Sequence, residues 1–176
     1  MRAFSKPLAS AVSVAAAASL AFAVAAAADG SKGKSSRHDD RAEKVLRTNL
    51  IPSLVAGPTV NGVMPGGKDW LLRRGSASIR SDGSIRVKVK GLVFAESGTT
   101  TTADGAFTLP AVSASLFCDG AAIPVGTTAP PAPLSADGNA KITGMLTLPA
   151  RCNAPTVMVH PGTNKAAYIA ISGFRM

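Results

Sequence analysis

The central part of the chain alternates apolar and polar residues with a period of two. Residues 85–90 read IRVKVK, and residues 77–80 (ASIR) follow the same alternation. A period of two places one side of a strand in the core and the other side in water. Asp82-Gly83 lies between the two runs and favours a tight turn, because glycine accepts a positive φ. The pattern therefore predicts a β-hairpin over residues 76–90.

The same alternation returns in the second half of the chain. It predicts strands over residues 112–118, 140–148, 157–159 and 168–174. Turns are marked by Asp-Gly pairs, which recur at 82–83, 104–105, 119–120 and 137–138. No segment past residue 50 keeps a helical period, and the chain holds 12 prolines and 17 glycines. We therefore predict an all-β fold, an antiparallel, immunoglobulin-like β-sandwich over residues 56–176.

The first 28 residues have the pattern of a secretory signal peptide. Arg2 and Lys6 precede an apolar run over residues 8–28, which ends in four alanines. The alternative is a retained membrane anchor, but alanine dominates the run and is only weakly hydrophobic. We expect cleavage after Ala27 or Ala28, with nothing left to hold the chain to a membrane. This predicts a secreted, extracellular protein with a place at the cell wall.

A polar stretch follows the predicted signal peptide. Residues 29–44 contain no large apolar side chain, so they cannot offset the entropy lost on ordering. We expect a flexible, basic tail over residues 29–55. A short helix through Leu46, capped by Asp39 or Asp40, is the alternative. His38 lies in this tail without a second ligand nearby, which indicates a solvated histidine and not a metal site.

The chain has only two cysteines, Cys118 and Cys152. In an oxidising compartment such a pair is usually bridged, and the spacing is much too wide for a CxxC redox motif. A bridge here closes a loop of about 34 residues and stabilises the domain by about 3.5–4 kcal/mol in the chain-entropy model. We predict a structural disulfide.

Candidates for catalysis are few. His160 at the end of a predicted strand has no adjacent nucleophile motif, and no GxSxG elbow occurs. The best carboxylate pair for a hydrolase is Glu96 with Asp69 or Asp104, although most aspartates lie in Asp-Gly turns. Two histidines and two cysteines cannot supply the usual zinc sites. We therefore predict no enzyme, no catalytic residues, no metal and no cofactor.

The formal charge of the 176-residue chain is +9 at pH 7, and basic residues concentrate in the predicted hairpin. Alternation places Arg86, Lys88 and Lys90 on one face, and Arg80 can join them across the turn. These four residues are the predicted site for an anionic cell-wall polymer. The alternative is a solvated face whose lysines discourage edge pairing. Nucleic acid is a poor partner, because no aromatic residues interleave with the charges.

A second hypothesis is a secreted protein-binding module, such as an inhibitor of an extracellular enzyme. The loops over residues 98–103 and 126–134 are its candidate presenting elements. Trp70, the only tryptophan, fits a core position better than an exposed sugar site. The oligomeric state stays open.

Several short motifs together resemble small secreted proteins of high-GC Gram-positive bacteria, a family with no assigned activity. The motifs are residues 70–75 (WLLRRG), 87–89 (VKV), 112–116 (VSASL) before Cys118, and 167–170 (AYIA). The likeness covers about residues 68–174. It implies a secreted β-rich domain and carries over no catalytic residues.

Overall fold

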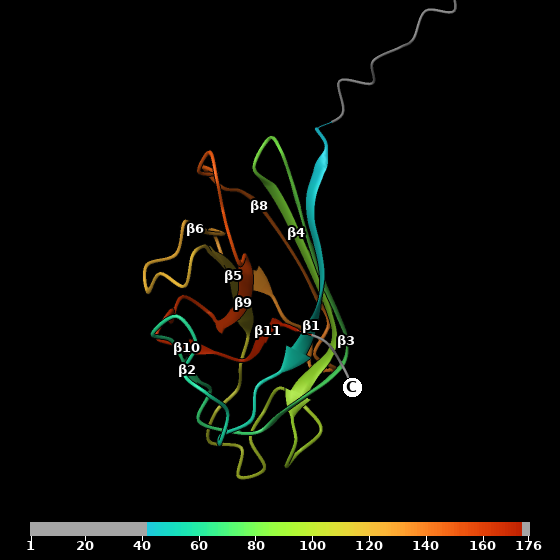
Figure 1. The fold of residues 1–176 in the computed structure, drawn as a ribbon. Coiled ribbons are helices and arrows are strands. Elements are labelled where there is room, and N and C mark those ends of the chain that lie inside the picture. The colour runs from blue at the N-terminus through green and yellow to red at the C-terminus, as the bar shows by residue number, and fades with distance from the viewer. Residues whose placement is uncertain (1–41, 174–176) are drawn as a thin grey trace, which may run out of the picture. The chain divides into compact units, whose positions relative to one another are not determined.

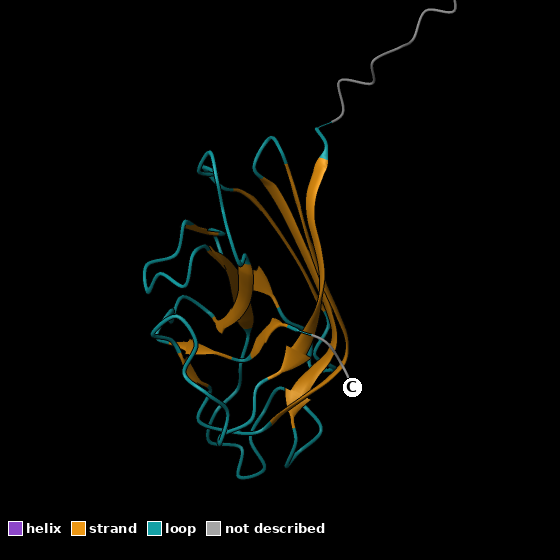
Figure 2. Ribbon diagram, in the orientation of Figure 1, coloured by secondary structure: helices purple, strands orange, loops and turns teal. Residues whose placement is uncertain are grey.

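The computed structural model describes residues 42–173, and within them every regular element is a β-strand (Figure 2). The strands are β1 (Lys44–Pro52), β2 (Met64–Pro65), β3 (Trp70–Arg80), β4 (Ser84–Phe94), β5 (Ala111–Phe117), β6 (Gly126–Thr127), β7 (Ala132–Pro133), β8 (Ala140–Met145), β9 (Thr156–Pro161), β10 (Ala167–Tyr168) and β11 (Ala170–Ser172). The all-β prediction is confirmed. The signal peptide predicted over residues 1–28 and the part of the predicted tail before residue 42 lie outside the described residues.

The predicted hairpin forms and is longer than expected. β3 and β4 pair antiparallel from Trp70 opposite Phe94 to Ile79 opposite Ile85. In the turn, the Asp82 carboxylate accepts the Ser84 N–H at 2.8 Å, and Gly83 has a φ of 85°. Gly83 also faces the backbone of Leu146 so closely that a Cβ has no room there. The Asp-Gly pair therefore forms the tight turn that the sequence predicts.

Nine strands form one sheet, in the order β6-β5-β9-β11-β1-β3-β4-β8, with β7 paired to β5 as well. The pairings in this sheet are antiparallel, whereas β10 and β2 form a separate parallel pair. β1 joins the two halves of this sheet. Its first part pairs with β3, in the half formed by β1, β3, β4 and β8, and its last part, Leu50 to Pro52, pairs with β11, in the half formed by β11, β9, β5, β6 and β7. β1, β3, β4 and β8 form a curled half-barrel (Figure 1).

The main core fills the concave side of the curled sheet. Alternate residues of the strands point into it, among them Leu50, Val87, Val112 and Val159, each with no exposed surface. Complete burial of such a side chain stabilises the fold by about 1.5–3 kcal/mol. A second, smaller cluster around Phe117 and residues of β9 to β11 covers the opposite face of the half formed by β5, β9 and β11. The second half of the sheet is therefore buried on both faces.

The predicted boundary of the tail at residue 55 is wrong, because Lys44–Pro52 form β1. The alternative of a helix through Leu46 is wrong for the same reason. Leu46 and Leu50 pack against the core, and Thr48 between them lies on the same side of the strand. Thr48 is polar, so the apolar alternation is interrupted and the strand is hidden in the sequence. Two other predicted ends also differ, since β8 ends at Met145 and the last strand is divided into β10 and β11.

Candidate functional site

The structure places the four predicted polymer-binding residues on the convex face of the half-barrel. On β4, Ile85 and Val87 point into the core, whereas Arg86, Lys88 and Lys90 are exposed. Arg80 is exposed at the end of β3. The alternation seen in the sequence therefore gives these residues one common face.

Strand pairing adds four further cations that the sequence analysis missed. Lys44 lies opposite Arg80, Arg74 lies opposite Lys90, and Lys141 lies opposite Lys88. Arg47 lies opposite Ser78 on the same face. We define the basic face as the eight exposed residues Lys44, Arg47, Arg74, Arg80, Arg86, Lys88, Lys90 and Lys141. They come from four strands and include eight of the twelve lysines and arginines within residues 42–173.

Three cross-strand pairs on this face join like charges: Lys44–Arg80, Arg74–Lys90 and Lys88–Lys141. Like charges directly opposite each other destabilise a sheet. Within residues 42–173 the only ion pair joins Lys68 and Glu96, which lie off this face. The repulsion on the basic face is therefore not compensated by carboxylates of the described chain.

Acidic side chains occur at the ends of the strands and not on the basic face itself. Hydrogen bonds donated by the backbone and side chain of Ser84 are the main cause that holds the pKa of Asp82 below its usual value. The charge of Arg80 lowers the pKa of Asp82 further. Asp82 is therefore ionised at neutral pH and serves the hairpin turn.

Two shallow depressions lie between the cations of the basic face. One, of about 250 Å³, is lined by residues that include Arg80, Arg86 and Ser78. The other, of about 230 Å³, adds Arg47 and Lys88 and shares Ser78. Serine hydroxyls thus form the floor between basic walls, which is an arrangement of hydrogen-bond donors suited to an anion.

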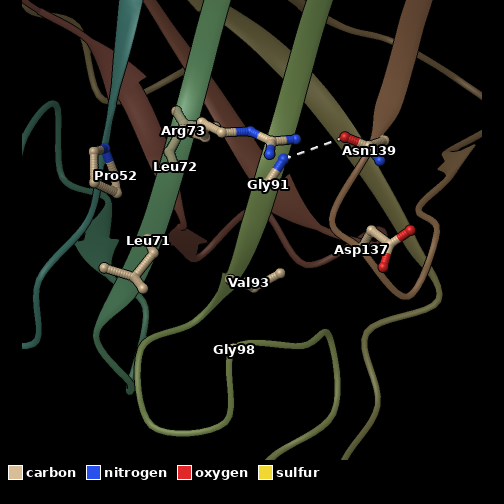
Figure 3. Close-up of a pocket in the computed structure, with 9 residues that line it drawn as sticks. All are labelled: Pro52, Leu71, Leu72, Arg73, Gly91, Val93, Gly98, Asp137 and Asn139. Carbon is tan, nitrogen blue, oxygen red and sulfur yellow. Dashed lines mark hydrogen bonds between the residues drawn. The ribbon is translucent and has the colours of Figure 1, made fainter.

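A third and larger depression, of about 940 Å³, borders the basic face where β4 ends its pairing with β8. Inward- and outward-facing residues alternate along β3 and β4, and the alternation shifts by one residue here, at Arg73 on β3 and at Gly91 on β4. Gly91 has a φ of 66°, and the side chain of Arg73 extends across it toward Asn139 (Figure 3). The Asn139 side-chain oxygen accepts the Gly91 N–H at 3.3 Å. Asp137, Leu71 and Val93 complete a mixed polar and apolar lining.

Cys118 and Cys152 lie at disulfide-bonding distance, as the sequence predicts. Their Cα atoms are 5.0 Å apart. Beside them, the Asp119 N–H donates to the Asn153 carbonyl, and the Asn153 N–H donates to the Asp119 carboxylate at 3.0 Å. The pair therefore connects the end of β5 to the segment that leads into β9.

His160 on β9 is completely buried, which does not suit a residue that must meet a substrate. Its Nδ1 lies 2.8 Å from the Ala167 carbonyl, and its Nε2 has no partner among the described residues. Burial is the main cause that lowers the pKa of His160, and the charge of Lys165 lowers it further. The hydrogen bond to Ala167 raises the pKa in part but does not reverse the direction.

The burial of His160 predicts an acid-sensitive fold. Since its folded pKa lies below its unfolded pKa of about 6.5, the unfolded chain binds more protons. Stability is therefore complete above the unfolded pKa and falls as the pH drops toward the folded pKa, by up to about 1.4 kcal/mol per pH unit. Urea unfolding at pH 7, 6 and 5 measures this slope. His160→Asn is expected to flatten it, and an equal slope in the variant would contradict the assignment.

The carboxylates considered for hydrolysis serve local structure. Glu96 pairs with Lys68 at 3.2 Å, and Asp69 accepts the Val55 N–H at 2.7 Å. Asp104 accepts hydrogen bonds from Thr102 and Ala106, which lower its pKa. Within residues 42–173 no three metal-ligating side chains cluster.

Trp70 is a core residue, as the sequence predicts. It is 3% exposed and packs on Phe94 with ring centroids 4.1 Å apart. The loop over residues 126–134, a candidate presenting element, contains β6 and β7 and is paired to β5. The buried Thr128 in this loop accepts the Ala114 N–H. Much of that loop is therefore part of the sheet.

No family model matches this sequence, and neither a curated protein nor a solved structure matches it. The resemblance to small secreted proteins of high-GC Gram-positive bacteria stays a prediction. None of residues 42–173 forms a helix that could cross a membrane.

Proposed function

We propose that this chain is a secreted, non-enzymatic protein of the cell envelope that binds an anionic wall polymer through its basic face. The observation that carries the proposal is the set of three like-charge pairs on one face that no carboxylate of residues 42–173 compensates. A face that served solvation alone gains nothing from placing cations directly opposite each other. A bound polyanion turns this repulsion into attraction, because each cation then faces an opposite charge.

The size of the basic face favours a polymer over a small anion. Its eight cations extend over four strands, which lie about 4.8 Å apart. Residues two positions apart along a strand are separated by about 6.7 Å. The charges therefore form a two-dimensional field and do not converge on one point, so a ligand with repeated charges makes the most contacts.

Secretion is part of the proposal and rests on the predicted signal peptide over residues 1–28. The cysteine pair is consistent with it, because disulfides persist in oxidising compartments. An immunoglobulin-like sandwich is the finer fold that we propose for the two halves of the sheet. The core between the halves supports this, since inward-facing residues of β3, β4, β5 and β9 share one cluster.

Co-sedimentation of the purified mature chain with isolated Gram-positive cell walls tests the proposal. We expect binding at low salt that weakens by about 100-fold or more between 50 mM and 500 mM salt, because several charge contacts are screened together. Walls stripped of anionic polymers should lose the binding. Absence of binding at low salt would reject the proposal, and salt-insensitive recovery of a protein partner would favour the binding-module hypothesis.

A further inference from the structure

One row of the basic face alternates arginine and hydroxyl side chains across four strands. Ser78 on β3 lies directly between Arg47 on β1 and Arg86 on β4, and Thr143 on β8 follows Arg86. All four side chains belong to the convex face, because the residues between them along each strand point inward. This Arg-Ser-Arg-Thr row crosses the middle of the face.

Ser78 is half-buried, and no hydrogen bond within residues 42–173 uses its hydroxyl. The same is true of Ser76, which lies opposite Lys88. Both hydroxyls line the depression walled by Arg47 and Arg86. Of the two, Ser78 lies between two arginines, and residues 42–173 provide no acceptor for its hydroxyl.

We propose that this row is a phosphate subsite, in which one phosphate group of the polymer lies over Ser78 between Arg47 and Arg86. The inference rests on the proposed function and names the charged group that the basic face selects. The two arginine Cα positions are two strand spacings apart, about 9.6 Å, which leaves room for one anion between their side chains. Each guanidinium then donates to an oxygen from its own side, and the serine hydroxyl donates from below.

The geometry of the row favours phosphate over carboxylate. The oxygens of a phosphate group point away from phosphorus in different directions, so donors on two sides and beneath reach separate oxygens. The acceptor sites of a carboxylate lie close to one plane. Arginines on two sides can reach that plane, whereas a hydroxyl that approaches from below lies outside it, so the three donors together suit a phosphate better.

The neighbouring cations suit a polymer in which phosphates repeat. Lys88 is the next outward-facing residue on β4 after Arg86, with the two Cα atoms about 6.7 Å apart. Lys141 lies opposite Lys88. On the other side, Arg80 and Lys44 lie opposite each other beyond Ser78. Phosphates on either side of the bound one therefore meet a further cation.

A phosphate polymer without bases fits this face better than a nucleic acid. Single-stranded nucleic acids are bound through aromatic side chains on which the bases stack. Of the aromatic residues described, Trp70, Phe94, Phe117 and Tyr168 are buried, and Phe107 belongs to the loop between β4 and β5. None of these five aromatic side chains belongs to the basic face.

The test compares the affinity of the chain for short inorganic polyphosphate and for polyglutamate of equal charge, by calorimetry at one fixed salt concentration. We expect a preference for polyphosphate of about tenfold or more. Arg47→Lys with Arg86→Lys keeps the charge but removes the planar donors, so it should reduce the preference to about twofold or less. Ser78→Ala should reduce it in part.

Arg73→Lys with Arg151→Lys is the matched control, because both arginines lie outside the eight residues of the basic face. It should keep the preference, and far-ultraviolet circular dichroism should show that every variant folds. Equal affinity of the unaltered chain for both polymers would overturn the phosphate subsite, while salt-dependent wall binding would still support the proposed function. Single-stranded DNA bound more tightly than polyphosphate would also overturn it. If neither polymer binds at low salt, the proposed function fails as well.

Discussion

Replacing Arg86, Lys88 and Lys90 together with serine is expected to reduce wall binding by about 100-fold at low salt. The change removes three of the eight cations of the basic face, and the dependence of log affinity on log salt should become shallower by about three. The fold should not lose stability, because two like-charge pairs, Lys88–Lys141 and Arg74–Lys90, disappear. Co-sedimentation across a salt series and thermal unfolding measure the two effects separately.

A variant of equal net charge is the control for this result. Lys68, Arg151 and Lys165 are exposed and lie off the basic face, so their replacement by serine removes the same charge elsewhere. We expect wall binding of this control within about threefold of the unaltered chain, because its screened charges lie outside the contact. Equal losses in both triple variants would mean that binding follows net charge alone, and the basic face would have no special role.

Replacing Cys118 and Cys152 together with alanine is expected to lower the free energy of unfolding by about 3.5–4 kcal/mol. The bridge closes a loop with a sequence separation of 34 residues, and without it the unfolded chain gains conformational freedom. Cys118 also packs in the main core, so the loss of its sulfur adds a smaller cost. Urea unfolding at pH 7 of both proteins measures the difference.

Reduction of the unaltered chain provides a second route to the same state. Dithiothreitol should shift its urea midpoint toward that of the double variant and leave the variant unchanged. A reduced chain as stable as the oxidised one would show that the bridge does not constrain the unfolded state. Two free thiols in the secreted protein would contradict the bridge itself.

Local patterns in the sequence were sufficient for the elements whose two faces differ clearly. The β3–β4 hairpin was predictable because Ile85 to Lys90 alternate strictly and Asp82-Gly83 strongly favours a tight turn. β1 was missed because Thr48 occupies an inward position between Leu46 and Leu50. The burial of His160 was also hidden, since it depends on the second cluster that covers the outer side of β9.

The candidate site shows the same division between local and long-range information. Arg86, Lys88 and Lys90 share a face by alternation within one strand, and this could be read from the sequence. Arg47 and Lys141 join them only through strand pairing, from segments on either side of the hairpin. Cross-strand register depends on the whole sheet, so the row of Arg47, Ser78 and Arg86 appears only in three dimensions.

The division of β1 between β3 and β11 has a consequence for the order of folding. Leu50 pairs with Ser172 and Pro52 with Ala170, so the first strand meets the last across almost the whole described chain. Contacts so far apart in sequence form late, because a long loop must close first. In a chain that ends before residue 170, the strand pairing that joins the two halves of the sheet therefore cannot form.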